Sequence, residues 1–215
     1  MMKFDAVLFD LDGTIMDSAP GIFATLLKTF EHYGVKREVA ELSKYLGPPL
    51  RFTMADNVPQ SEVENATALY RKIYEKDGIF NAVPYEGVAD MLAALKNAGL
   101  TLCVATCKPK TVAEAVLEHF GLISFFDYVG GASLDTSVDT KTAVIESVLV
   151  QQCMTGKTAI MVGDRADDMI GAKNCNLPAI GALYGYGSKE ELAPFEPVFM
   201  AKSPIEISDY LTEEN

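Results

Sequence analysis

The sequence predicts an α/β fold in which a doubly wound parallel sheet forms the core and an all-helical segment is inserted after the first strand. Short apolar runs recur along the chain and end in turn-forming or polar residues, as buried strands do. From residue 82 onward, segments with helical periodicity separate these runs. Strands that are apolar throughout indicate a sheet that helices cover on both faces.

Five apolar runs are expected to be the strands of the sheet: residues 3–9, 100–105, 125–129, 158–162 and 179–183. Four helices are expected between them: residues 88–97, 109–120, 140–152 and 166–174. Gly99 and Gly121 follow the first two of these helices, where glycine commonly ends a helix.

Residues 18–80 contain helical patterns but no convincing strand. We expect helices at residues 20–33, 38–46, 50–57 and 61–76. This predicts a core domain of residues 1–16 and 82–215 and a helical cap domain of residues 17–81, with linkers near residues 14–18 and 78–84.

Composition and charge exclude several classes of protein. The 215 residues carry a formal net charge of −12, whereas a nucleic-acid-binding or anionic-membrane-binding surface needs positive charge. No apolar run is long enough to span a bilayer, so a cytoplasmic protein is expected. The four cysteines form no C-x-x-C pair, which favours buried free thiols over disulfides or zinc ligands.

Polar clusters follow the predicted strands. Residues 10–14 read Asp-Leu-Asp-Gly-Thr, Thr106 and Lys108 follow the second strand, Lys141 begins a helix, and Gly163-Asp164 precedes Asp168. Because ligands bind at the carboxyl ends of the strands in an open parallel sheet, these residues are expected to converge.

The clustered carboxylates predict a metal ion. Asp10 and Asp12 alone fit an ordinary turn, with Gly13 at positive φ. A second acidic cluster at the same edge would repel the first unless a cation joined them. Oxygen ligands favour Mg²⁺, which keeps waters and takes a phosphate oxygen of the substrate.

Thr106, Lys108 and Lys141 supply groups that bind phosphate. A hydroxyl and one or two ammonium groups can hold the non-bridging oxygens of a phosphoryl group. The alternative for Lys141 is a solvated lysine, although a cation at a helix N-terminus opposes the helix dipole. Lys108 is ambiguous in the same way.

In its motifs the chain resembles the haloacid dehalogenase superfamily of hydrolases, in the phosphoglycolate-phosphatase-like group. Residues 10–14 match the family's D-x-D-G-T signature, Thr106 its phosphate-binding Ser/Thr, and Lys141 its later lysine. Residues 163–168 match its GD-x-x-x-D motif. The order, the spacing and the position of the insertion agree over essentially the whole chain, which implies a Rossmann-like core with a helical cap.

The resemblance implies a role for each matching residue. Asp10 is the nucleophile that forms an aspartyl-phosphate, and Asp12 is the general acid and base. Asp10, the backbone carbonyl of Asp12 and Asp164 bind Mg²⁺, and Asp168 supports the metal site or Lys141. Thr106 and Lys141 orient the phosphoryl group, and Lys108 assists.

The resemblance also implies that the cap contacts the substrate. The loop of residues 46–50 resembles the substrate loop of related caps, which makes Pro48 and the adjacent Arg51 candidates for substrate contact. Four tyrosines lie in the cap segment, and one or two are expected to face the cleft: Tyr33, Tyr45, Tyr70 and Tyr74.

The function expected from these features is hydrolysis of a small phosphorylated metabolite. Phosphoglycolate is the leading substrate by resemblance, followed by nucleoside monophosphates. A sugar phosphomutase, which returns the phosphoryl group to a sugar, is the main alternative enzyme. A phospho-signalling receiver is usually about half this length and has no cap, and a catalytically silent binding protein would be expected to have lost Asp10 or Asp12. Either a monomer or a homodimer is compatible with the sequence.

Overall fold

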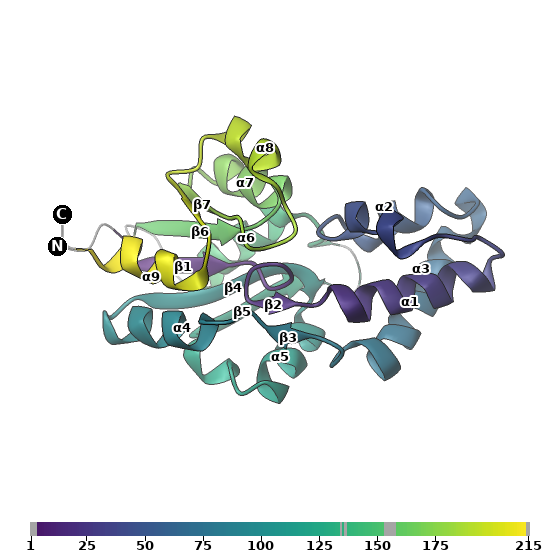
Figure 1. The fold of residues 1–215 in the computed structure, drawn as a ribbon, viewed down its shortest axis with the longest axis horizontal. Helices are drawn as coiled ribbons and strands as arrows, with labels where there is room; N and C mark the ends of the chain where they lie inside the picture. The colour runs from purple at the N-terminus through teal and green to yellow at the C-terminus, as the bar shows by residue number, and fades with distance from the viewer. Residues whose placement is uncertain (1–3, 134, 136, 153–157, 214–215) are drawn as a thin grey trace.

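A computed structural model describes residues 4–133, 135, 137–152 and 158–213. Six parallel strands form one sheet in the order β5-β4-β1-β6-β7-β8 (Figure 1). Their bounds are β1 Ala6–Phe9, β4 Thr101–Pro109, β5 Tyr128–Ala132, β6 Ala159–Gly163, β7 Ala179–Ala182 and β8 Phe199–Ala201. From β1 the chain adds β4 and β5 on one side of the sheet and then β6, β7 and β8 on the other side, so the sheet is doubly wound. The predicted α/β fold is confirmed.

Alternate side chains of the central strand pack on opposite faces of the sheet. Val7 and Phe9 belong to one hydrophobic cluster, with helices α4 (Val88–Asn97), α5 (Lys110–His119) and α9 (Pro204–Thr212). Ala6 and Leu8 belong to the other, with α6 (Lys141–Gln151), α7 (Ala166–Asn174) and α8 (Lys189–Leu192). Helices therefore cover both faces, which is why β1 is apolar at every position.

A helical segment leaves and re-enters the core through a small antiparallel sheet of β2 (Met16–Asp17) and β3 (Val83–Pro84). We call residues 18–82 the cap segment; it extends away from the carboxyl ends of the strands (Figure 1). Its elements are α1 (Ala19–His32), η1 (Val39–Glu41), η2 (Ser43–Tyr45), α2 (Leu50–Ala55), η3 (Gln60–Glu62), α3 (Val63–Ile73) and η4 (Tyr74–Gly78).

The expected strand at residues 125–129 is wrong in its position. Residues Ile123–Phe125 form a 3-10 helix, η5, and the strand runs instead from Tyr128 through Gly130 and Gly131. A Cβ added to Gly130 would lie 2.2 Å from Cγ2 of Val148 on α6. The glycine therefore lets a helix approach the strand closely and does not mark a turn.

Other differences concern short elements. The helix expected at residues 38–46 is two 3-10 helices, and β8, α8 and α9 were not expected from the sequence. Cys107 and Cys175 are free thiols as expected, but they are only partly buried; Cys103 is buried, and Cys153 lies outside the described residues. Among the described helices, none has the length and apolar character needed to cross a membrane.

Replacing Leu8 with alanine tests the contribution of the two-sided core. Leu8 is fully buried in the centre of the sheet. Leu8→Ala should lower the free energy of unfolding by about 2–5 kcal/mol, because it leaves a cavity in a packed core. Urea denaturation measures this, with Val150→Ala as the control, because Val150 is 73% exposed and its truncation should change stability by less than about 0.5 kcal/mol. Equal effects of the two substitutions would contradict the assignment of Leu8 to the core.

Candidate active site

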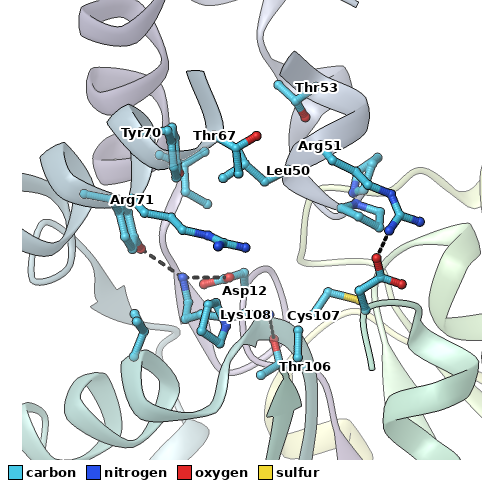
Figure 2. Close-up of a pocket in the computed structure, with 18 of the residues that line it drawn as sticks. Asp12, Leu50, Arg51, Thr53, Thr67, Tyr70, Arg71, Thr106, Cys107 and Lys108 are labelled. Carbon is cyan, nitrogen blue, oxygen red and sulfur yellow. Dashed lines mark hydrogen bonds and ion pairs between the residues drawn. The ribbon is translucent and has the colours of Figure 1, made fainter. Parts of the chain in front are cut away.

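A cavity of about 350 Å³ lies between the carboxyl ends of the central strands and the cap segment (Figure 2). Asp10 and Asp12 line it from the loop after β1, and Thr106, Cys107 and Lys108 line it from the end of β4. Residues of α1, the loop before α2, α2 itself and α3 form the opposite wall. Two parts of the chain far apart in sequence thus enclose one polar space.

Asp10 directly follows β1 and is 5% exposed. Its Oδ1 atom accepts a hydrogen bond from the backbone N–H of Leu11 at 2.7 Å and pairs with Nζ of Lys141 at 2.7 Å. Burial raises the pKa of Asp10 to about 7, although the ammonium of Lys141 opposes this rise. Both contacts use Oδ1 and orient the carboxylate. Neither of them involves Oδ2.

Lys141 is buried at the start of α6 and holds three oxygen atoms. Its Nζ lies 2.7 Å from Oδ1 of Asp10, 2.8 Å from Oδ1 of Asp168 and 3.0 Å from the carbonyl oxygen of Ala105. An ammonium has three N–H donors, so these contacts use all of them. Lys141 positions Asp10 from behind the cavity, while its predicted contact with a phosphoryl group stays a prediction.

Asp10, Asp164 and Asp168 bring three buried carboxylates together, with one oxygen from each within 4.8 Å of the others. Asp164 accepts hydrogen bonds from the hydroxyl of Thr14 at 3.0 Å and from the backbone N–H of Tyr186 at 2.9 Å. Burial and the neighbouring carboxylates of Asp168 and Asp10 raise the pKa of Asp164 well above its usual range. Within the described part of the chain, Lys141 supplies the one ammonium that pairs with these carboxylates. An all-oxygen set with excess negative charge fits a hard divalent cation.

Gly13 makes the close approach of the acidic cluster possible. Its φ is +89°, and an added Cβ would lie 2.2 Å from Oδ2 of Asp164. Glycine is therefore needed in the Asp-x-Asp-Gly-Thr loop for both its conformation and its lack of a side chain.

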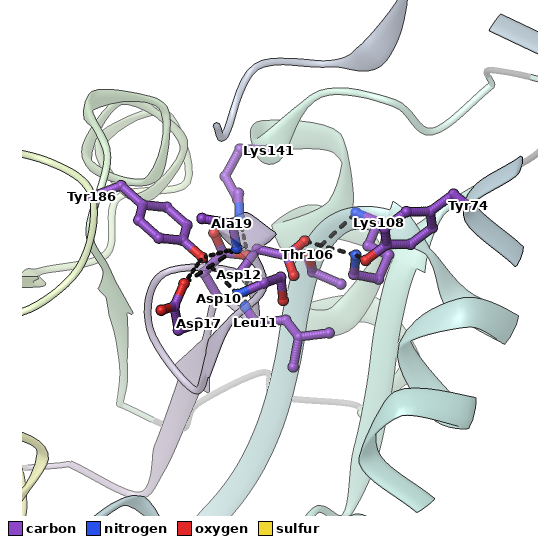
Figure 3. A network of polar contacts seen from close by, with 11 residues as sticks. Asp10, Leu11, Asp12, Asp17, Ala19, Tyr74, Thr106, Lys108, Lys141 and Tyr186 are labelled. Atoms are coloured by element: carbon purple, nitrogen blue, oxygen red, sulfur yellow. Dashed lines mark hydrogen bonds and ion pairs between the residues drawn. The ribbon is translucent and has the colours of Figure 1, made fainter. Parts of the chain in front are cut away.

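Asp12 and Lys108 form a second polar pair that reaches the cap segment (Figure 3). Nζ of Lys108 lies 3.0 Å from Oδ2 of Asp12 and donates to the hydroxyl of Tyr74 at 2.9 Å. Burial favours a neutral lysine, but Asp12 and Tyr74 outweigh burial and raise the pKa of Lys108. Oδ1 of Asp12 is buried and has no hydrogen-bond partner among the described residues. Thr106 accepts a hydrogen bond from the backbone N–H of Lys108 at 3.2 Å.

The predicted cap loop is attached to the core by two arginines. The guanidinium of Arg165 donates to the carbonyl oxygen of Leu46 and pairs with Glu191 at 2.9 Å. Arg51 forms an ion pair with Asp139 of the core. Pro48 and Arg51 both line the cavity, so the loop lies where a substrate contact would require it.

The structure brings the predicted residues together in two layers. Those that line the cavity are Asp10, Asp12, Thr106, Lys108, Pro48 and Arg51. Lys141, Asp164 and Asp168 lie behind Asp10 and do not line it. Of the cap tyrosines, three line the cavity: Tyr45, Tyr70 and Tyr74.

Thr67 and Arg71 are among the cavity-lining residues of α3 that sequence reasoning missed. They are spaced four residues apart, and Tyr70 and Tyr74 continue the same helical face. This spacing of polar and aromatic residues was a signal in the sequence, but it does not show which face of the helix meets the core.

Known proteins resemble the chain over nearly its whole length. A 5'-nucleotidase from Pseudomonas aeruginosa is 30% identical over 199 residues, which cover 91% of this chain and 90% of that protein. A phosphoglycolate phosphatase from Vibrio cholerae is 29% identical over 213 residues and covers 94% of each chain. The tyrosine-protein kinase PtkA of Mycobacterium tuberculosis is 34% identical over 182 residues, but the chain spans only 62% of its length.

The fold has close structural neighbours. The crystal structure of a predicted phosphatase from Clostridium acetobutylicum has a TM-score of 0.92 and 35% sequence identity, and the match covers 98% of this chain and 99% of that one. Residues 7–182 match the family described as Haloacid dehalogenase-like hydrolase. This match includes the acidic cluster and the cap segment, and the chain therefore belongs to the haloacid dehalogenase-like hydrolase family.

Proposed function

We propose that this phosphatase depends on Mg²⁺, forms an aspartyl-phosphate on Asp10 and hydrolyses a small phosphate monoester, with phosphoglycolate as the leading substrate. One observation carries the proposal. Asp10 lines the cavity while Lys141 holds its Oδ1 from behind, and Asp12 stands beside it next to a lysine. A carboxylate that is held in position suits a nucleophile, and a second carboxylate beside it suits a general acid and base.

In the first half of the reaction, Oδ2 of Asp10 attacks phosphorus and the bond from phosphorus to the ester oxygen breaks. Asp12, protonated at the start of this step, gives its proton to the departing oxygen. In the second half, Asp12 takes a proton from water, which attacks phosphorus and releases inorganic phosphate and free Asp10. The hydroxyl of Thr106 and the ammonium of Lys108 would donate to the non-bridging oxygens as charge shifts onto them.

Mg²⁺ would be held by the carboxylates of Asp10 and Asp164 and by the backbone carbonyl of Asp12, with Asp168 in support. When bound, the ion neutralises the phosphoryl oxygens and the clustered carboxylates. Lys141 keeps Asp10 and Asp168 at a fixed separation in this arrangement. The cap segment covers the cavity, and its contact from Tyr74 to Lys108 helps to exclude bulk water.

Hydrolysis of a nucleoside 5'-monophosphate is the second candidate. The 5'-nucleotidase similarity favours it, and so do the three tyrosines that line the cavity, because aromatic faces can stack on a base. Tyr70 and Tyr74 are stacked on each other with ring centroids 5.6 Å apart. A substrate panel separates this candidate from phosphoglycolate.

Asp10→Asn tests the nucleophile. The variant keeps the shape of the side chain but loses its nucleophilic charge, so kcat should fall by about 10³-fold or more while thermal unfolding changes little. Phosphate release is measured with phosphoglycolate, nucleoside monophosphates, hexose phosphates and an aryl phosphate, with and without Mg²⁺. Asp209→Asn, at an exposed position on α9, is the control. Near-normal turnover by Asp10→Asn would exclude Asp10 as the nucleophile. If the folded wild type releases phosphate from no ester, a mutase or a binding protein is favoured.

Asp164→Ala tests the metal site. Loss of one of three clustered carboxylates should raise the Mg²⁺ concentration for half-maximal activity by about 10- to 100-fold, or abolish activity. Calorimetric titration with Mg²⁺ without substrate gives a second readout. Asp167→Ala is the matched control, because Asp167 lies three residues further along the chain, in the first turn of α7, but outside the cluster. An unchanged Mg²⁺ titration for Asp164→Ala would contradict the proposed ligand role.

Cys107 is the rival nucleophile in the cavity, and it can be tested separately. Burial raises the pKa of its thiol to about 12, so the thiol stays protonated and unreactive near neutral pH. Cys107→Ser should keep kcat/KM within about threefold of the wild type, and alkylation of Cys107 by iodoacetamide at pH 8 should be slow in peptide mapping. A loss above about 100-fold in the serine variant would assign the thiol a chemical role.

A further inference from the structure

The cations that line the cavity differ in whether they have acidic partners. Lys108 pairs with Asp12, and Arg51 pairs with Asp139. Arg71 also lines the cavity but forms no ion pair or hydrogen bond with any residue in the described ranges. Arg71 is therefore a cation of the cavity wall whose charge the protein leaves unmatched.

Arg71 faces the catalytic residues across the cavity. It lies on α3 of the cap segment, is partly buried, and its guanidinium points into the space above Asp12 and Lys108 (Figure 2). Thr67, one turn earlier on α3, also lines the cavity, is 8% exposed, and has a hydroxyl without a hydrogen-bond partner in the part of the chain that is described. This wall of the cap thus presents unused hydrogen-bonding groups to the space that a substrate would fill.

The chemistry of a guanidinium limits what it binds. Arginine has five N–H donors and no acceptor, and its planar fork matches two oxygens of a carboxylate or phosphate. Glu64 and Glu75 line the same cavity, but both are exposed and neither pairs with Arg71. Water screens exposed carboxylates, so they weaken the attraction of Arg71 for an anion only partly.

We propose that Arg71 determines specificity by binding a second anionic group of the substrate, at the end remote from the phosphoryl group that Asp10 attacks. This inference rests on the proposed function and narrows the substrate to compact phosphate esters that carry a carboxylate or a further phosphate. The phosphoryl group is held by the core, and the remote anion by the cap. A substrate with both groups joins the two walls of the cavity.

The test compares two esters of similar size, 2-phosphoglycolate and 2-hydroxyethyl phosphate; the second has an uncharged hydroxymethyl group where the first has a carboxylate. Arg71→Met should lower kcat/KM for phosphoglycolate by about 10- to 100-fold, mainly through KM, because a charged hydrogen bond to the substrate is lost. The same variant should change kcat/KM for 2-hydroxyethyl phosphate by less than about threefold. Arg71→Lys keeps the charge without the fork and should give an intermediate loss on phosphoglycolate alone.

Lys72→Met is the matched control, since Lys72 is the next residue of α3, is exposed, and does not line the cavity. It should leave both esters unaffected. Equal losses on the two esters in Arg71→Met, no loss on either, or a wild type that does not prefer phosphoglycolate would each overturn the inference.

The proposed function fails in a different way. If Asp10→Asn still turns over the esters, the nucleophile is wrong whatever Arg71 does. If Asp10→Asn is inactive and Arg71→Met loses both esters equally, only the role of Arg71 is wrong. Circular dichroism and thermal unfolding of each variant show that a loss is not caused by misfolding, and Arg71→Lys gives a second, milder substitution for the same comparison.

Discussion

The geometry of the site depends on one buried ammonium. Lys141 holds Asp10, Asp168 and a backbone carbonyl of β4 at once, so it joins three elements of the core at the carboxyl edge of the sheet. Buried carboxylates repel one another, and the ammonium offsets this repulsion. Removing one partner of a buried ion pair leaves an uncompensated charge, which costs about 3–5 kcal/mol of stability. The ammonium fixes Asp10 through Oδ1, and Asp10 lines the cavity. Gly13 then allows Asp164 to approach from the neighbouring strand loop.

The cap segment completes the site through a few polar contacts with the core. Arg165 binds the carbonyl of Leu46, Arg51 pairs with Asp139, and Lys108 binds the hydroxyl of Tyr74. Apolar contacts continue across the same boundary, because Leu26 and Phe30 of α1 belong to one hydrophobic cluster with Phe9 and Leu11 of the core. In the proposed reaction the core would provide the catalytic residues, and the cap would provide the residues that select the substrate.

The sequence predicted the parts of the molecule in which local patterns and sheet geometry agree. The bounds of α4 and α7 were predicted correctly, and the convergence of Asp10, Asp164 and Asp168 followed from their positions after parallel strands. The strand at β5 was misplaced because Gly130 reads as a turn, although it serves the close packing of α6. The role of Arg71 could not be predicted, because the helical period of α3 does not show which face meets the core. The contacts of Lys141 likewise depend on burial that only the tertiary fold creates.

The central claim is that Asp10 carries the phosphoryl group between the two halves of the reaction. The most direct measurement is to mix the enzyme with substrate and Mg²⁺, quench within the first turnover, and reduce with borohydride, which converts an aspartyl-phosphate to homoserine. Mass spectrometry of the peptides then locates the modified residue. The account predicts homoserine at position 10 in the wild type and unmodified peptide without substrate. Modification of another residue, or turnover with no modified residue at any quench time, would contradict it.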